Sequence, residues 1–246
     1  MVARARIVGA ASCESGAWLN AVPCSSVGTL LDGDSVRIGV GLRLGTRLCV
    51  THKCVCGMQV DERGTHGLSC KRSAGRIPRH SELNSIISRA LTSAGFPSIL
   101  EPPGMCRADS KRPDGLTLFP WKRGLSLSWD STCADTLAPS SLAHSAMQAG
   151  SAACTAEKAK ENKYAELEGK VIFVPLGFET IGAWGSTCLK TVKELGNLIK
   201  KKTGETRSGA FLMQRLSVAI QRGNAAAILG SAPRCRPLEE IFQLSY

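Results

Sequence analysis

Long apolar stretches are missing from this chain of 246 residues. No run of about eighteen apolar residues, the usual minimum for a membrane-spanning helix, occurs in the sequence. The first residues, MVARARIVGAASCESG, also lack the apolar core and the cleavage site of a secretory signal peptide. We therefore expect a soluble, intracellular protein with no membrane partner. Hydrophobic residues still make up 43% of the chain, which favours a buried core and excludes a disordered or fibrous protein.

Acidic residues are scarce relative to basic ones. The chain has 20 Asp and Glu against 31 Lys and Arg, which gives a formal net charge of +11. A positive excess of this size favours a polyanionic partner such as nucleic acid. The alternatives are a solvated basic surface and contact with an anionic membrane, but no basic amphipathic stretch favours the membrane.

Paired cysteine patterns are missing from most of the chain. The 11 cysteines are an odd number and are mostly scattered singly, which argues against a disulfide scaffold. The exception is a group of four metal-ligand residues, separated by one, nine and three others: Cys54, Cys56, His66 and Cys70. Such a set can close around a tetrahedral zinc ion with a structural role. Because the Cys-x-Cys start is tighter than usual, Cys49 and His52 are alternative ligands, and reduced thiols without metal are the alternative to zinc.

The hydrophobic pattern beyond this group alternates between helix and strand. Apolar residues at helical spacing predict a helix that starts at Ser81 and ends at Gly95 and Pro97. The further predicted elements are strands at 98–101, 114–119, 125–130 and 170–178, an Ala-rich helical stretch at 140–167 with Gly150 as a candidate break, and helices at 187–201 and 208–228. This order predicts an α/β protein, with a sheet flanked by helices.

Two carboxylates are predicted to face each other across the central hairpin. Pairing 114–119 with 125–130 so that Phe119 faces Leu125 puts Asp114 opposite Asp130. Opposed side chains on one face have Cβ atoms about 4.5–5.5 Å apart. Two carboxylates at this distance repel each other unless a cation lies between them, and a hard divalent ion such as Mg²⁺ or Mn²⁺ is the natural occupant. The alternative is that Asp114 is a turn residue and Asp130 a strand-end cap.

Three further residues are candidates for the same site. Glu101, at the end of the preceding strand, could add a third carboxylate. Lys160 or Lys163, on the following helix, could orient the attacking water or stabilise charge on a phosphodiester. The sequence leaves the choice between the two lysines open.

The motifs at these positions resemble a known nuclease pattern. Arg112-Pro113-Asp114, followed by Trp129-Asp130 and by the lysine-containing helix 160–164, looks like the PD-(D/E)XK pattern in the variant whose lysine has moved to a helix. The (D/E)XK tripeptide itself is absent, because Asp130-Ser-Thr has no Lys two residues on.

The order of the preceding motifs extends this resemblance. The Cys/His group comes first, and Arg79-His80 and Asn84 follow it. This succession resembles the C-terminal restriction-like endonuclease region of non-LTR retrotransposon polyproteins, where a CCHC knuckle lies between the reverse transcriptase and the nuclease. No polymerase-type Asp-Asp pair is present, so we expect no reverse transcription by this chain.

The resemblance implies a fold, a set of domains and partners. The implied fold is α/β, with a restriction-endonuclease-like mixed β-sheet core flanked by helices and an N-terminal zinc knuckle. The implied divisions are an N-terminal remnant or linker (1–48), a CCHC-type zinc knuckle (49–72), a restriction-like endonuclease core (73–205), and a C-terminal helix and tail (206–246). DNA is the implied partner, with the element's RNA and a reverse transcriptase of the same element as further candidates, and the implied location is nuclear.

The resemblance also implies nucleic-acid contacts. Arg79 and His80 would handle DNA, although they also fit a basic linker and a helix start. Arg112, beside the first carboxylate, is another candidate contact. At the hairpin tip, Trp121 is followed by Lys122 and Arg123, a set that could brace a duplex. A buried tryptophan in an exposed turn is the alternative.

The sequence therefore predicts a metal-dependent DNA endonuclease. Asp114 and Asp130 would hold Mg²⁺ or Mn²⁺, Glu101 would assist, and Lys160 or Lys163 would act on the water or the phosphate. The alternatives are a non-catalytic zinc-containing nucleic-acid-binding protein derived from such an element, and a decayed fragment without a cellular role.

Overall fold

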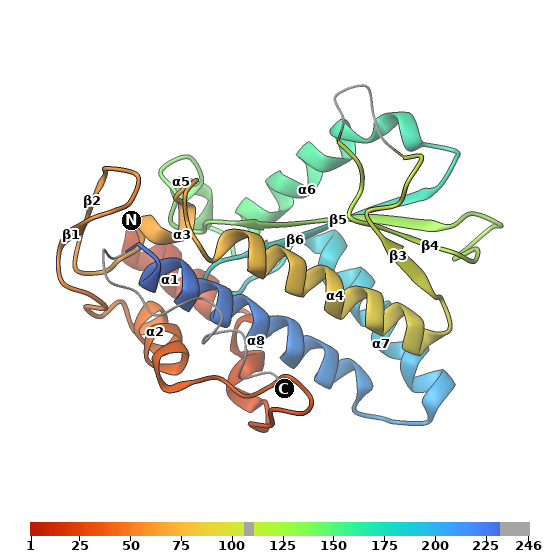
Figure 1. Cartoon of the computed structure of the whole chain (residues 1–246), viewed down its shortest axis with the longest axis horizontal. Coiled ribbons are helices and arrows are strands. Elements are labelled where there is room, and N and C mark those ends of the chain that lie inside the picture. Colours follow the sequence, from red (N-terminus) through yellow and green to blue (C-terminus); the bar gives the residue numbers. More distant parts are fainter. Residues whose placement is uncertain (106–110, 232–246) are drawn as a thin grey trace.

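The computed structural model describes residues 1–105 and 111–231, so part of the predicted tail, 232–246, lies outside the described residues. A four-stranded sheet runs through the middle of the molecule (Figure 1). Its strands lie in the order β3 (Ser98–Leu100), β4 (Gly115–Thr117), β5 (Leu127–Ala134) and β6 (Ile172–Glu179). β4 is antiparallel to both of its neighbours, β3 and β5, whereas β5 and β6 run parallel through eight residue pairs. The sheet is mixed, and the predicted α/β class is confirmed.

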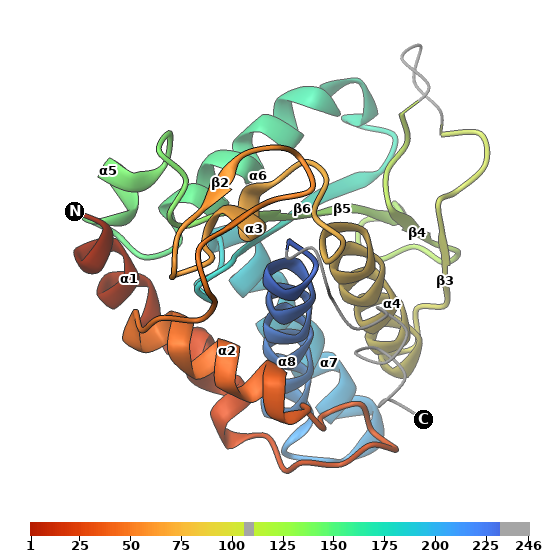
Figure 2. The same cartoon turned by 60° about the vertical axis from the view of Figure 1, so that its left-hand side comes forward.

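Helices cover both faces of this sheet, as Figure 2 shows. One face packs against three helices: α4 (Arg76–Ala94), α7 (Ser186–Thr203) and α8 (Ser208–Leu229). The other face packs against α6 (Ser151–Lys163), which connects β5 to β6 through the short η2 (Ala165–Leu167). Because side chains alternate across a strand, Trp129 of β5 enters the large core while its neighbour Asp130 points toward α6.

The helix ends follow local sequence signals, with one correction. α4 ends at Gly95, whose φ of 98° is the left-handed conformation that glycine adopts at helix ends. Its start at Arg76 precedes the predicted start at Ser81. Pro78 falls in the first turn, where a missing N–H leaves no hydrogen bond unmade, so the turn-rich composition does not prevent helix formation. Gly150, with a φ of 77°, breaks the Ala-rich stretch into α5 (Leu142–Ser145) and α6, as expected.

The strand lengths depart from the prediction, but the inner register does not. The pairs Gly115↔Trp129 and Leu116↔Ser128 are those that place Asp114 and Asp130 at matching positions of the hairpin. Nearer the tip, the predicted pairing of Phe119 with Leu125 is wrong, because Leu125 pairs with Lys122 in a tighter turn. β4 is therefore shorter than predicted, and β5 extends to Ala134 because β6 pairs with it that far.

Residues 1–48 fold onto the body of the chain, although their sequence suggested a remnant or linker. They form α1 (Val2–Ala10), η1 (Glu14–Asn20) and α2 (Gly33–Leu44). The Trp18 amide donates to Ser217 Oγ of α8 (3.3 Å), and Ser15 Oγ donates to the Ile181 carbonyl (2.9 Å). These contacts hold η1 against both the end of the sheet and α8.

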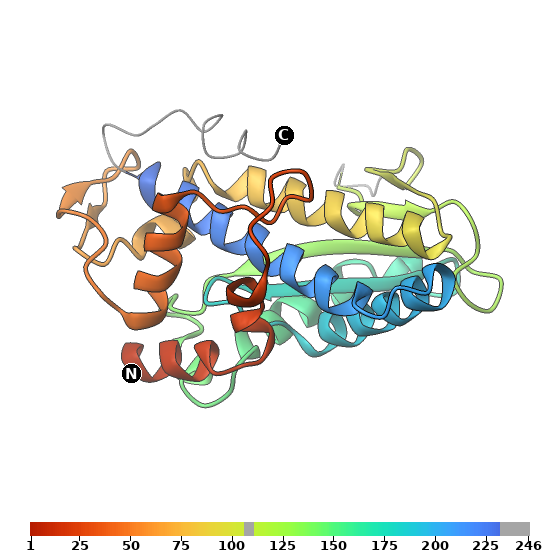
Figure 3. The same cartoon turned by 90° about the horizontal axis from the view of Figure 1, so that it is seen from below.

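A small hairpin and helix follow α2. They consist of β1 (His52–Lys53), β2 (Gln59–Val60) and α3 (His66–Ser69). This unit lies at the same end of the elongated molecule as α1 and α2, and the tip between β4 and β5 lies at the other end (Figure 3). Gly67 of α3 packs directly on α8, since an added Cβ would lie 2.7 Å from the Ala227 carbonyl oxygen. Within the described ranges, no helix has both the length and the apolar character needed to cross a membrane.

Candidate functional site

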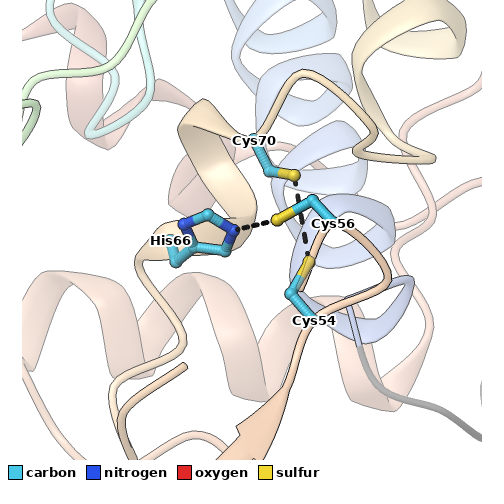
Figure 4. Close-up of side chains that lie close together, drawn as sticks. All are labelled: Cys54, Cys56, His66 and Cys70. Carbon is cyan, nitrogen blue, oxygen red and sulfur yellow. Dashed lines mark hydrogen bonds between the residues drawn. The ribbon is translucent and has the colours of Figure 1, made fainter. Parts of the chain in front are cut away.

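Three thiols and one imidazole converge at the β1-β2 hairpin and α3 (Figure 4). Cys54 and Cys56 lie in the hairpin turn, where the Cys54 amide donates to the Met58 carbonyl (2.9 Å) and Gly57 has a φ of 94°. A side chain is strained at that φ, so the glycine allows the tight turn that brings both thiols to one side. The other two groups come from either end of α3: His66 begins the helix, and Cys70 follows its last residue.

The four ligand atoms have the spacing of a tetrahedral zinc site. All lie within 4.8 Å of one another. The sulfurs of Cys54 and Cys70 are 3.8 Å apart, and Cys56 Sγ lies 3.2 Å from His66 Nε2. Four ligands about 2.3 Å from a zinc ion would place two sulfurs about 3.8 Å apart. The Cys/His cluster can therefore hold a metal ion such as zinc.

The thiols of this cluster differ in acidity. A hydrogen bond from the Met58 amide is the main cause that lowers the pKa of Cys56 to about 6. Burial is the main cause that raises the pKa of Cys70 to about 11. A thiol binds metal as the thiolate, so Cys70 needs a nearby positive charge to ionise near neutral pH, and a bound zinc ion supplies one.

The two alternative ligands are engaged elsewhere. Cys49 Sγ donates to the Asp61 carbonyl (3.3 Å), and His52 Nε2 lies 3.0 Å from Ser231 Oγ. Among residues 1–105 and 111–231, the Cys/His cluster is the only group of three or more His, Cys, Asp or Glu side chains close enough to share one ion. The ligand set is thus the one expected from the sequence spacing.

A second polar group, which we call the carboxylate site, lies where α4, the β4-β5 hairpin and α6 meet. It consists of His80, Asn84, Asp114, Asp130 and Lys160. The antiparallel register brings in the two aspartates, and the parallel crossover through α6 brings in the lysine. The hairpin register predicted from the sequence brings both aspartates here, and the packing of α4 adds the histidine and asparagine.

Asp114 is held by α4 and β5. Its Oδ2 lies 3.0 Å from His80 Nε2 and accepts a hydrogen bond from the Ser131 amide (2.6 Å). Burial alone would raise the pKa of Asp114, but the hydrogen bond and charge of His80, with the Ser131 amide, lower this pKa overall. The same hydrogen bond raises the pKa of His80 against the opposing effect of its burial. Each of the two groups thus favours the charged form of the other.

Asp130 is held by α6. Its side chain is 4% exposed, and its Oδ1 lies 2.6 Å from Lys160 Nζ. Its Oδ2 lies 3.8 Å from Lys163 Nζ, and that ammonium also donates to the Tyr164 hydroxyl (2.7 Å). Residues three apart share a helix face only in part, so Lys160 makes the direct ion pair and Lys163 supports it from farther away.

Asn84 connects the site to the core, a role that the sequence analysis did not assign to it, since it named this residue only as part of the order of motifs. Its Oδ1 accepts hydrogen bonds from Trp129 Nε1 (3.0 Å) and Ser131 Oγ (2.7 Å). The asparagine is 5% exposed, and its side chain also contributes to the lowered pKa of Asp114. The position of Trp129 in the core therefore fixes the geometry around the carboxylates.

Glu101 does not join the two aspartates as a third ligand. Its carboxylate is 69% exposed and pairs with Arg112, while its amide donates to the Asp114 carbonyl (2.8 Å). The backbone of Glu101 therefore helps to position Asp114, and its side chain points to solvent. Arg112, which the sequence analysis named as a candidate contact for nucleic acid, therefore pairs with Glu101.

A cavity of about 260 Å³ opens beside the carboxylate site. Its polar lining includes Arg76, Arg79, His80, Ser131 and Lys160. Arg79 is 3% exposed and donates to Asn224 Oδ1 of α8 (2.8 Å), so this predicted DNA contact is largely buried between helices. The cationic lining can accept an anion of phosphate size next to the two aspartates.

The tip of the hairpin does not present an aromatic brace. Trp121 is buried and packs edge-on against Phe96, with ring centroids 4.6 Å apart, so of the two alternatives the buried tryptophan is the one found. Lys122 pairs with Glu194 of α7 (2.5 Å). Arg123, with a φ of 51°, is exposed and remains available as a contact.

Two other buried carboxylates cap helices. Glu157 accepts hydrogen bonds from the amides of Thr187 (3.1 Å) and Cys188 (2.9 Å) at the start of α7. Glu179 accepts hydrogen bonds from the amides of Ala152 (2.9 Å) and Ala153 at the start of α6. A carboxylate at a helix N-terminus satisfies amides that lack helical partners, so both glutamates have a structural role.

Comparison with protein-family models finds no match to this chain, and comparison with curated proteins finds none either.

Proposed function

We propose that this chain is a metal-dependent DNA endonuclease with a restriction-endonuclease-like core and a zinc knuckle formed by the Cys/His cluster. The observation that carries the proposal is that Asp114, Asp130 and Lys160 all lie close enough to His80 to act on it, with Asp130 paired to Lys160. Paired carboxylates with an adjacent ammonium are a set that phosphodiester hydrolysis uses. A mixed sheet with helices on both faces is compatible with such a core.

The donor chemistry of the aspartates suits a hard divalent ion. Asp114 and Asp130 supply carboxylate oxygens, the ligands that Mg²⁺ and Mn²⁺ prefer. When bound, such an ion neutralises phosphate charge and lowers the pKa of water. At present His80 contacts an oxygen of Asp114 and Lys160 contacts an oxygen of Asp130. Binding of the ion would require each carboxylate to turn an oxygen from this partner toward the ion.

The remaining groups act on the substrate directly. Lys160, once released from Asp130, can neutralise charge on the scissile phosphate, and the lining of the 260 Å³ cavity can hold a neighbouring phosphate. Arg123 at the exposed tip can meet the phosphate backbone. DNA is the proposed substrate, which agrees with the net charge of +11, and the location that we propose is nuclear. Element RNA and a reverse transcriptase of the same element are further proposed partners.

A non-catalytic nucleic-acid-binding protein is the second candidate. One observation favours it: His80 and Lys160 already pair with the two aspartates, and the described residues bring no third carboxylate to them. In that case the basic surface and the Cys/His cluster would bind nucleic acid, and the carboxylate site would be an internal ion-pair network.

A plasmid-nicking assay with the full chain tests the proposal. Supercoiled DNA is incubated with and without MgCl₂ or MnCl₂, using the wild type, Asp114→Asn and Asp130→Asn. We expect nicking that needs the ion and is lost in both variants, with equal or slightly tighter DNA binding because phosphate repulsion is reduced. Glu168→Gln is the matched control, since it removes one exposed carboxylate away from these residues.

The lysines give a second readout from the same assay. Lys160→Ala should slow nicking on the order of 10²-fold, as expected for loss of a group that stabilises developing charge. Lys163→Ala should have a smaller effect, because its ammonium is 3.8 Å from Asp130. Equal nicking by the wild type and Asp114→Asn would refute the proposed site. DNA binding that EDTA leaves unchanged, without nicking, would favour the binding protein.

A further inference from the structure

A larger cavity, of about 420 Å³, lies between α4, α7 and α8. It is separate from the carboxylate site. His80 and Arg89 are nine residues apart on α4, which places them on opposite sides of the helix and about 14 Å apart along its axis. The volume is within the range of small-ligand sites in proteins.

The floor of this cavity is apolar. Ile86 and Ala90 of α4 and Leu212 of α8 are buried, whereas the Phe211 side chain is 39% exposed at the rim. A large aromatic ring that stays half-exposed beside an apolar floor offers a surface on which another flat ring can stack.

Three arginines surround this floor: Arg89, Arg207 and Arg215. Within residues 1–105 and 111–231, none of their side chains makes a hydrogen bond or an ion pair. Arg215 Nε is buried without a partner, and burial lowers the pKa of this guanidinium. The one acid of the lining, Glu205, accepts a hydrogen bond from the Arg207 amide (2.8 Å). The lining therefore has three guanidiniums and one carboxylate, an excess of positive charge, although Glu82 also acts electrostatically on Arg215.

The start of α8 adds to this positive character. Ser208, the first residue of this 22-residue helix, lines the cavity. No acidic residue lies in its first turn, although the Glu205 carboxylate, just before the helix, accepts a hydrogen bond from the Arg207 amide. The first amides of a helix attract anions, so the helix and the three guanidiniums act on the same space.

We propose that this cavity binds a nucleotide, either free or as an unpaired residue of a single strand. The guanidiniums hold the phosphate, because their planar forks match phosphate oxygens in pairs. The base lies over the apolar floor beside Phe211, where base-aromatic stacking tolerates any sequence. A DNA duplex cannot bind in this way, since its bases are paired and stacked inside the double helix. The inference shares with the proposed function only the premise of nucleic-acid binding.

Fluorescence anisotropy with a labelled oligothymidylate of about ten nucleotides tests the inference. We expect Arg89→Ala and Phe211→Ala each to weaken binding about tenfold, the size of a lost charged contact or stacked base. Arg4→Ala is the matched control: it removes one exposed arginine from α1 and should change affinity less than about twofold. Circular dichroism confirms that each variant is folded, and Arg89 is exposed, so its loss leaves the core intact.

Competition identifies the source of the nucleotide. Displacement by thymidine monophosphate supports a free nucleotide, and displacement by an unlabelled single strand but not by the monophosphate supports a strand. Equal affinities of Arg89→Ala and Arg4→Ala would overturn the inference, as would an equally effective duplex competitor or stronger displacement by dodecyl phosphate. Failure of the endonuclease proposal would instead appear as intact strand binding without nicking.

Discussion

Replacement of Gly115 by alanine tests how the core positions the carboxylate site. Gly115 is buried at the start of β4, and a Cβ added there would lie 2.1 Å from Cζ2 of Trp129 and 2.2 Å from Cη2. The Trp129 ring cannot simply move aside, because it is fully buried in the core among α4, α7 and α8. Any displacement of the ring also strains the hydrogen bond from its Nε1 to Asn84 Oδ1.

Two contributions set the expected loss in the free energy of unfolding. Forcing one extra methyl group into a packed core typically costs about 1–3 kcal/mol. A weakened buried hydrogen bond adds about 0.5–1.5 kcal/mol. We therefore expect Gly115→Ala to lower the free energy of unfolding by about 2–4 kcal/mol, a large fraction of the 5–15 kcal/mol typical of a folded domain.

Urea unfolding followed by tryptophan fluorescence measures this change. Gly33→Ala is the matched control, because Gly33 begins α2 and an added Cβ there has no atom within 4 Å. Its free energy of unfolding should change by less than about 0.5 kcal/mol, or rise slightly through improved helix propensity. If Gly115→Ala is no less stable than Gly33→Ala, the contact between β4 and Trp129 is not as tight as described, and the argument that the core fixes Asn84 is wrong.

Three further predictions concern the metal, a buried acid and the basic surface. Cys56→Ser or His66→Ala should lose stoichiometric zinc in elemental analysis and weaken nucleic-acid binding, whereas Cys49→Ser should keep its zinc; a wild-type chain purified without zinc would contradict the metal assignment. Burial raises the pKa of the Glu157 carboxyl above its ordinary 4.5, so the folded state binds the carboxyl proton more tightly than the unfolded state. The stability of the wild type should therefore fall as pH rises from 4.5 through the raised pKa. Glu157→Gln should lose less stability over that interval in urea unfolding at several pH values, and an identical pH dependence in the two proteins would contradict the assignment. For duplex DNA, the logarithm of the binding constant should fall with the logarithm of salt concentration by about 0.9 per phosphate contact, and a flat dependence would count against nucleic-acid binding.

Local patterns in the sequence determined several features correctly. The end of α4 at Gly95 and the break at Gly150 were predicted because glycine takes a left-handed φ at little cost. The matching positions of Asp114 and Asp130 followed from strand alternation, which depends only on residue spacing. The Cys/His cluster was predictable because a tight turn and a short helix bring nearby residues together. In each case the decisive interactions lie within a short stretch of chain.

Tertiary packing decided the features that join distant segments. The rotation of α6 about its axis relative to β5 makes Lys160, and not Lys163, the close partner of Asp130. The sequence spacing of the two lysines does not determine this rotation. The Glu101 side chain pairs with Arg112 and not with the site. Trp121 is buried in the core, because burial of a large ring is more favourable than its exposure at a turn. Of the three arginines of the 420 Å³ cavity, Arg89 comes from α4, whereas Arg207 immediately precedes α8 and Arg215 lies within it, more than a hundred residues away in sequence. Their proximity depends on how these helices pack, because packing, and not local propensity, determines which distant side chains share one space.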